Sequence, residues 1–363
     1  MKLLKGYSKQ ETSWMMYDWA NSAHSVIIVT LLPIFFDTVA GYTADSVSSM
    51  STWGYATSIA MLIVALAAPF LGVFGDIRGM RKKLFSFFML LGVAACAGMA
   101  FTPGMDFTSG PVAAGKVASL ILVLYIVSVI GFDASAIYYD AFLTDVTIED
   151  RMDKVSTMGY GLGYIGGSTI PLLIFLIMNL VGVPMLTCLA FVFGLTAVWW
   201  LAFSLPLLKN CEQTSGKPYE KGDVARSIKG VGTTIKEIIA NKPMLIYILS
   251  YFFYIDGVHT VISMATTYGT NLGLDSTGMM LALLLVQILG LPFCLLYIKC
   301  SEKFGARTMV GFGICVYMFI CIFAFFMNSL WQFWMLAVLC ATSQGGIQAL
   351  SRSMFGKLIP DKD

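Results

Sequence analysis

Apolar residues in this chain occur in long uninterrupted blocks that are separated by short polar segments. Each block has about 20 residues, the length that a helix needs to cross roughly 30 Å of hydrocarbon at about 1.5 Å per residue. Continuous apolar runs do not fit a membrane β-barrel, whose strands alternate apolar and polar positions. The blocks predict ten membrane-spanning helices, over residues 15–39, 53–75, 84–101, 118–143, 155–180, 186–208, 244–268, 277–299, 309–327 and 330–355.

Composition supports the same fold class, an all-α polytopic membrane protein. Hydrophobic residues make up 58% of the chain and charged residues 12%, whereas about a quarter of the residues in a soluble domain are charged. The chain has 23 lysines and arginines. Lys116 falls on one side of the predicted membrane, and all the others fall on the opposite side. The positive-inside rule therefore places the N-terminus in the cytoplasm and predicts a multi-pass protein of the cell (inner or plasma) membrane.

A long polar segment divides the chain into two parts. Residues 209–243 contain Gly, Ser, Pro and mixed charges, and they follow six of the predicted helices. We interpret them as a cytoplasmic linker. The expected organisation is a six-helix repeat over residues 1–208, the linker, and a second repeat over residues 244–363 with four helices.

Two short patterns occur once in each part and in the same order. The segment after the second span reads GDIRGMRKK, and the segment after the eighth span reads SEKFGARTM. The shared acidic-x-x-G-x-R spacing is formed by Asp76, Gly79 and Arg81 and by Glu302, Gly305 and Arg307. The only two histidines lie in the matching heptapeptides N-S-A-H-S-V-I and D-G-V-H-T-V-I. Matches in register predict duplicated halves, and parallel six-helix repeats are the build of a large transporter class.

Ionisable side chains inside membrane spans are costly, so they mark functional candidates. Here they gather on the first, fourth, seventh and tenth spans and, at about 100° per residue, form stripes along one side of a helix. By their depth we predict a substrate or ion site near mid-membrane, made by Asn21, His24, Asp133, Asp256, His259 and Gln344. A cytoplasmic gate is predicted from Asp18, Asp140 and Arg352, with Arg352 pairing with a carboxylate of the fourth span.

His259 lies one turn from Asp256, and an adjacent carboxylate raises the proton affinity of an imidazole. The pair is therefore our candidate carrier of a coupling proton. The bland alternatives stay open: His24 as a hydrogen-bonded packing residue, and Asp18 and Arg352 as residues that cap a helix or extend to the interface.

The glycine-rich stretch GYGLGYIGG, residues 159–167, has two interpretations. Its G-x-G-x-x-G spacing imitates a dinucleotide fingerprint, but that motif needs a preceding strand and an aqueous helix N-terminus. Gly159, Gly163 and Gly167 instead recur every four residues, which predicts a face for close helix packing. With Pro171, they also predict a bend in this span.

Several of these segments resemble a known family. The segment GVFGDIRGMRKK resembles the loop signature of the major facilitator superfamily. The stretches YDWANSA, YDAFLTDV, GYGLGYIGG and GGIQALSRSMFGKLIP are similar to its vacuole-effluxer-like branch, of bacterial type. The resemblance implies two parallel six-helix repeats whose first, fourth, seventh and tenth helices line a central cavity. Against that pattern, the second repeat here lacks its last two helices.

The resemblance also implies a role for the loop signature and a substrate class. Asp76 and Arg81, and Glu302 and Arg307 in the second copy, would control conformation by holding the halves together at the cytoplasmic face. Yeast members of the branch export amino acids from the vacuole. We therefore expect a secondary active transporter of small polar solutes, most of all amino acids, working by alternating access in the efflux direction with a coupling proton.

Two other functions stay open: a carrier of sugars or polyols from the same superfamily, and a non-transporting receptor derived from one. An enzyme is not expected, because the Tyr17-Asp18 and Gly131-Phe-Asp133 pairs only partly imitate an intramembrane aspartyl protease. We also expect no cofactor, no metal site and no nucleic-acid partner. The expected partners are a small-molecule solute, a proton and the lipid bilayer, and the expected state is a monomer.

Overall fold

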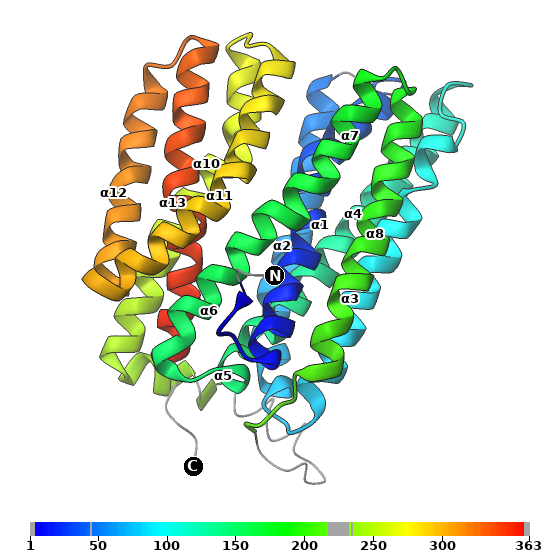
Figure 1. Ribbon diagram of the computed structural model, residues 1–363. Helices are drawn as coiled ribbons and strands as arrows, with labels where there is room; N and C mark the ends of the chain where they lie inside the picture. Colours follow the sequence, from blue (N-terminus) through cyan, green and yellow to red (C-terminus); the bar gives the residue numbers. More distant parts are fainter. Residues whose placement is uncertain (1–3, 44–45, 217–231, 234, 359–363) are drawn as a thin grey trace. The chain divides into compact units, whose positions relative to one another are not determined.

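The computed structural model describes residues 4–43, 46–216, 232–233 and 235–358, and these residues are almost entirely helical (Figure 1). No residue in these ranges forms a strand. The helices are α1 (Lys9–Ala40), α2 (Ser46–Gly75), α3 (Met80–Met99), η2 (Thr102–Gly104), α4 (Pro111–Ala141), α5 (Leu143–Val146), α6 (Glu149–Leu162), η3 (Gly163–Thr169), α7 (Ile170–Leu180), α8 (Met185–Asn210), α10 (Lys242–Asn271), α11 (Ser276–Phe304), α12 (Ala306–Phe325) and α13 (Leu330–Leu358).

The predicted spans are confirmed. Within the described ranges, 10 helical segments are long and apolar enough to cross a membrane, and each overlaps one predicted block. The fifth segment, Glu149–Leu180, consists of α6, η3 and α7 in succession. Many large apolar side chains point outward, among them Leu66, Phe252 and Phe325, which are 65%, 64% and 81% exposed. Such an apolar surface suits lipid rather than water.

The chain divides into two compact units that do not follow the linear order of the sequence. Unit 1 comprises Met1–Trp19, Leu143–Ile165 and Gly232–Asp363, and unit 2 comprises Ala20–Phe142 and Gly166–Val231. The boundaries between the units therefore fall inside α1 and inside η3. The division into residues 1–208, 209–243 and 244–363 stays a prediction.

Unit 2 is built around α4, which packs against α2 and α3, while α3 also packs against α8. Glycines permit the closest approach. A Cβ at Gly131 of α4 would lie 2.5 Å from the Gly92 nitrogen of α3, and a Cβ at Gly92 would collide with the ring of Trp200 on α8. Trp200 is fully buried. Backbone contact and a large aromatic ring thus fix these three helices together.

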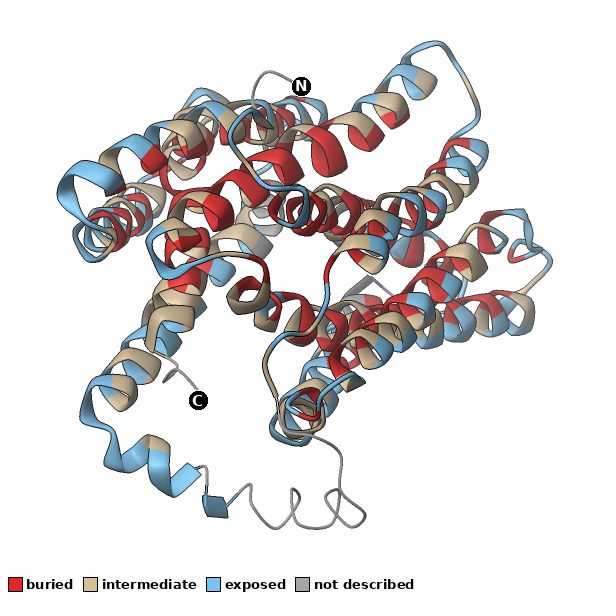
Figure 2. Ribbon diagram, turned by 60° about the horizontal axis from the view of Figure 1, so that its bottom comes forward, coloured by how far each residue is buried: buried red, intermediate tan, exposed pale blue. Residues whose placement is uncertain are grey.

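Unit 1 is built around α13, which packs against α6, α11 and α12. The ring of Tyr164 fills the space left by glycines on two of these helices, because a Cβ at Gly290 or at Gly345 would collide with it. Figure 2 shows buried residues on the inward sides of the helices and exposed residues on their outer turns. The ring of Tyr164 therefore packs against both α11 and α13, at Gly290 and Gly345.

The glycine-rich stretch changes the type of helix. Gly163–Thr169 form a π-helix between α6 and α7. Short π segments interrupt regular helices and are frequent at functional sites. Gly159 fits its predicted packing role, because a Cβ there would collide with the carboxylate of Asp18 on α1. The dinucleotide interpretation stays rejected, because this stretch follows a helix and not a strand.

Candidate functional site

A buried ion pair lies inside unit 1, between Asp18 of α1 and Arg352 of α13. Arg352 Nη2 lies 3.0 Å from Asp18 Oδ2, and the two side chains are only 7% and 8% exposed. Arg352 Nε also donates to Ser156 Oγ at 2.8 Å, and Nη2 donates to the Ser156 carbonyl at 3.0 Å. A charge-assisted network of this kind offsets the cost of burying the guanidinium.

Aromatic rings complete the surroundings of this guanidinium. The Arg352 Cζ atom lies 4.6 Å from the ring centroid of Trp14 and 4.5 Å from that of Tyr160. Both distances are within the range of a cation–π interaction. We call Trp14, Asp18, Ser156, Tyr160 and Arg352 the arginine cage.

The arginine cage gives Arg352 a partner that the sequence-based prediction did not name, Asp18. The expected pairing with a carboxylate of the fourth span, Asp140, stays a prediction, because Asp140 belongs to unit 2. Asp140 is exposed at the end of α4. Spacing along a helix could not reveal this, because the choice of partner depends on how α1, α6 and α13 meet.

A second tie joins the start of α1 to α6. Arg151 donates to both carboxylate oxygens of Glu11, from Nε at 2.8 Å and from Nη2 at 2.9 Å, and Thr147 donates to Glu11 Oε1 at 2.7 Å. Glu11 and Ser8 also form a capping box, with each side chain accepting from the other residue's backbone N–H. The S-x-x-E spacing was visible in the sequence, but its long-range partner was not.

Tyr7 lies beside this tie, outside the membrane-spanning segments. Its ring centroid is 5.7 Å from the Arg151 guanidinium and 5.7 Å from the Lys154 ammonium. Burial raises the pKa of the phenol to about 12, although the charge of Arg151 acts in the opposite direction. The ring is therefore a neutral, aromatic contact for both cations near pH 7.

A third tie joins α6 to α13. Lys357 Nζ lies 2.8 Å from Asp153 Oδ2, and Ser353 Oγ donates to Asp153 Oδ1 at 2.6 Å. Together with the arginine cage, this gives α6 polar contacts along its length to both α1 and α13. The sequence-based prediction named neither Asp153 nor Ser156, because single polar residues at the end of a span carry no distinctive spacing.

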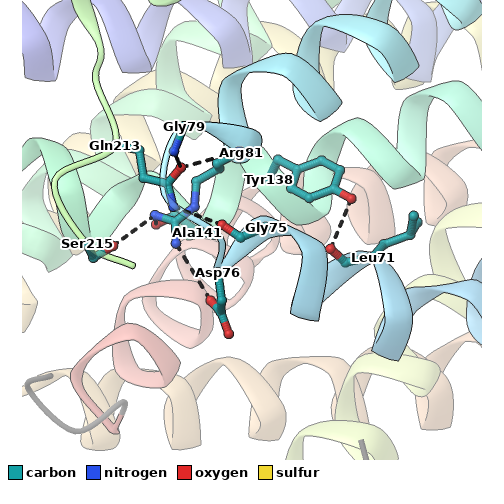
Figure 3. Close-up of polar contacts among 9 residues, drawn as sticks. All are labelled: Leu71, Gly75, Asp76, Gly79, Arg81, Tyr138, Ala141, Gln213 and Ser215. Atoms are coloured by element: carbon teal, nitrogen blue, oxygen red, sulfur yellow. Dashed lines mark hydrogen bonds and ion pairs between the residues drawn. The ribbon is translucent and has the colours of Figure 1, made fainter. Parts of the chain in front are cut away.

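In unit 2, the D-x-x-G-x-R turn places Arg81 among three helix ends (Figure 3). Its side chain is 6% exposed and donates from Nη1 to the Ala141 carbonyl at 3.1 Å and to Ser215 Oγ at 3.3 Å. The guanidinium also lies 5.7 Å from the Phe142 ring. Asp76 is 3.9 Å away and 57% exposed, so it is the weaker of these partners. Gly79 permits the turn by adopting φ 82 and ψ −3.

The second copy of the pattern, in unit 1, has a different environment. Gly305 has φ 82 and ψ 149 and separates α11 from α12. Glu302 and Arg307 are both exposed. The shared spacing thus marks a glycine turn between two helices in each copy, but only the first arginine is buried.

The mid-membrane candidates in unit 2 are largely packed inside it. His24 is 3% exposed, stacks on Phe132 at 4.7 Å, and has Nε2 3.3 Å from Ser128 Oγ. Asn21 is also buried, at 8% exposure. Asp133 is half-buried, and its Oδ2 atom is buried without a hydrogen-bond partner in the described part of the chain. The surroundings of His24 are those of a packing residue, whereas Asp133 keeps an unused acceptor.

The remaining candidates lie in unit 1. Asp256 and His259 are both exposed, one turn apart on α10, and Gln344 is half-buried on α13. The structure therefore brings together Asp18 with Arg352 and Asp76 with Arg81. The assembly of the six mid-membrane candidates into one site stays a prediction, because they are distributed over both units.

Known proteins resemble this chain over most of its length. Residues 7–150 and 144–363 match the family described as vacuole effluxer Atg22 like. The chain belongs to this family. It is 41% identical over 368 residues, covering 99% of this chain and 83% of the relative, to an uncharacterized MFS-type transporter, YxiO of Bacillus subtilis. It is 24% identical over 243 residues to autophagy-related protein 22-1 of Penicillium rubens, covering 60% of this chain and 41% of that protein.

Solved structures support the fold of this Atg22-like protein. The proton:xylose symporter XylE matches with a TM-score of 0.66 at 15% identity, covering 96% of this chain and 85% of XylE. This likeness identifies the major facilitator fold. The protein is therefore a multi-pass membrane transporter of the major facilitator superfamily, and not an enzyme.

Proposed function

We propose that this protein is a secondary transporter that exports small polar solutes, with amino acids as the first candidates, by alternating access. The family description as a vacuole effluxer is the support for an efflux direction. The single observation on which the mechanism depends is the arginine cage. It joins α1 and α6 to α13, which the sequence assigned to different repeats.

Alternating access requires contacts that hold one state and can be released in the other. The Asp18 and Arg352 charges are buried, so leaving either one without its partner would cost about 3–5 kcal/mol. Separation of the pair therefore needs water to reach both groups at once. In our proposal the cage is closed when the predicted cytoplasmic side is shut, and it opens as a unit when solute is loaded from the cytoplasm.

A coupling proton is part of the proposal, with two candidate carriers. Asp256 and His259 lie one turn apart on α10, and both are exposed, so the packing of unit 1 does not enclose them. Asp133 has a buried carboxylate oxygen without a partner in the described residues, and such an oxygen favours binding a proton or the ammonium group of a solute. An amino acid would thus find a counter-charge for its ammonium group at Asp133.

Transport in proteoliposomes tests the proposed substrate class. Purified protein is reconstituted, one set of vesicles is loaded with a mixture of unlabelled amino acids and a parallel set with unlabelled xylose, and the entry of each radiolabelled amino acid or of radiolabelled xylose by counterflow is measured. We expect counterflow of at least one amino acid and none of xylose. Counterflow of xylose alone, or binding without any flux, would overturn the proposal in favour of the sugar carrier or the receptor.

The cage is tested by charge changes at its two ends. D18N and R352Q should each slow counterflow, while the R352K variant, which keeps the charge but not the planar contact with Trp14 and Tyr160, should be intermediate. K242A removes an exposed cation at the start of α10 and serves as the matched control. If D18N and R352Q transport as fast as K242A, the cage is not a gate.

A further inference from the structure

The segment that follows α8 is the first part of the predicted linker, and it lies against the D-x-x-G-x-R turn (Figure 3). Gln213 Oε1 accepts from the backbone N–H groups of Gly79 at 2.9 Å and Arg81 at 3.3 Å. Its Nε2 donates to the Gly75 carbonyl at 2.9 Å. One amide therefore serves the free donors at the start of α3 and a free acceptor at the end of α2, groups that every helix end leaves unsatisfied.

The residues around Gln213 fit the turn closely. Ser215 accepts from Arg81 at 3.3 Å. Gly216 has φ 115, and a Cβ there would lie 2.6 Å from the Asp76 carbonyl oxygen and 2.9 Å from Gln213 Nε2. Cys211, which ends α8, is fully buried. We call residues 211–216 the latch. The side chains of Gln213 and Ser215 hydrogen-bond to the turn, and Gly216 fits against the turn because it has no side chain.

We propose that Gln213 is a positioning residue that makes the latch and the D-x-x-G-x-R turn move as one body. Arg81 is held by the latch and by the end of α4, so a displacement of the chain after α8 changes the hydrogen bonds of Arg81 directly. This step rests on the alternating-access function proposed above.

The second copy provides an internal comparison. There, Glu302 and Arg307 are exposed, and the turn from the end of α11 to the start of α12 has no counterpart of Gln213 within hydrogen-bond distance in the described residues. The chain enters α12 directly after Gly305. A latch is therefore a property of the first copy, and the comparison supplies the control variant for its test.

Cys211 is a native reporter for the latch, because it is buried two residues before Gln213. The purified protein is treated with N-ethylmaleimide, and peptide-level mass spectrometry follows the alkylation of Cys211 alone. Removal of the amide in Q213M cancels three hydrogen bonds, so we expect Cys211 to react at least about tenfold faster than in the wild type. Q213E keeps the acceptor for Gly79 and Arg81 but places a carboxylate oxygen against the Gly75 carbonyl, so its alkylation rate should lie between those of the wild type and Q213M.

Controls separate positioning from a loss of fold. E212A changes an exposed neighbour and should leave the alkylation rate unchanged, as should R307A. R81A should accelerate the alkylation of Cys211, because it removes the hydrogen bond from Arg81 to Ser215 of the latch. Thermal unfolding is recorded for each variant, and if Q213M unfolds near the assay temperature, S215A tests the latch in its place. The same Cys211 rate in wild type, Q213M and S215A would refute the latch.

The labelling needs no solute, so its outcome is independent of the proposed substrate. Counterflow then gives the functional arm: Q213M should transport more slowly than E212A and Q213E. Fast alkylation with normal transport would mean that the latch exists but does not act in transport. If Q213M is alkylated as slowly as the wild type, the latch proposal is contradicted. If the wild type transports no solute, the transport proposal is contradicted, whatever the alkylation rate.

Discussion

The two copies of the acidic-x-x-G-x-R pattern share their letters but differ in their surroundings. In unit 2, Arg81 is 6% exposed and hydrogen-bonds Ala141 and Ser215. In unit 1, Arg307 and Glu302 lie on the surface. Both turns have a glycine with φ 82, but ψ is −3 at Gly79 and 149 at Gly305. Both copies form a glycine turn between two helices. Within the described residues, the first copy also has partners from the end of α4 and from the segment after α8.

The histidine heptapeptides show the same inequality. His24 is enclosed by Phe132, Ser128 and Trp200 in unit 2. His259 lies on the exposed side of α10 in unit 1. In both comparisons the residue in the first repeat is buried and partnered and its counterpart is exposed. We infer that the first copies contribute mainly to the stability of unit 2 and that the second copies are free to respond to solute, protons or water.

The largest expected effect distinguishes the two arginines. R81A leaves the Ala141 carbonyl and Ser215 without their charged donor, so it should lower the free energy of unfolding by about 3 kcal/mol. R307A removes an exposed side chain and should change it by less than about 0.5 kcal/mol. Thermal or chemical unfolding in detergent measures both. Equal effects would mean that burial does not distinguish the two copies.

The next comparison uses the histidines. H24A opens a cavity against Phe132 and Trp200 and removes the contact with Ser128, at a cost of about 2 kcal/mol. H259A should leave stability within about 0.5 kcal/mol, yet it should remove the response of transport to an imposed pH gradient if His259 carries the coupling proton. Unfolding midpoints and vesicle flux with and without the gradient give the two readouts. An unchanged pH response in H259A and D256N together would leave Asp133 as the carrier.

The smallest expected effect concerns the two glycines. G305A forces an alanine into a backbone region that is almost exclusive to glycine, at about 1–2 kcal/mol. At Gly79 the left-handed helical conformation admits asparagine, so G79N should cost about 0.5 kcal/mol or less. Both positions have open space for a Cβ, which makes backbone strain the only term compared. A larger loss in G79N than in G305A would contradict the assigned backbone angles.

Much of the fold followed from the sequence because it depends on local pattern. Each apolar block of about 20 residues became a helix, since an isolated block of that length has no other way to satisfy its backbone in lipid. The glycine spacing of residues 159–167 predicted close packing and a bend, and Gly159 contacts Asp18 while Gly163–Thr169 form a π-helix. The polar residues that matter were also visible, because charges inside spans are rare.

The choice of partners was not visible in the same way. The pairing of Arg352 with Asp18 was not predicted, and Gln213 had no distinguishing pattern in a polar segment. Hydrogen bonds between residues far apart in the chain depend on helix crossings, and those depend on glycines and aromatic rings that meet only after folding. Ser156 is an example, because its hydroxyl can accept a hydrogen bond from Arg352 only where α6 packs against α13.

By itself, the sequence determined the membrane-spanning helices, the duplicated turn and histidine patterns, and the set of ionisable residues within the spans, because hydrophobic length and residue spacing act locally. Only the tertiary structure decided which of these residues are buried and paired: Asp18 with Arg352, Arg81 with the latch, and His24 with its aromatic neighbours. The physical reason is that a buried charge without a partner destabilises the folded state. Which side chain can be that partner depends on which helix packs alongside.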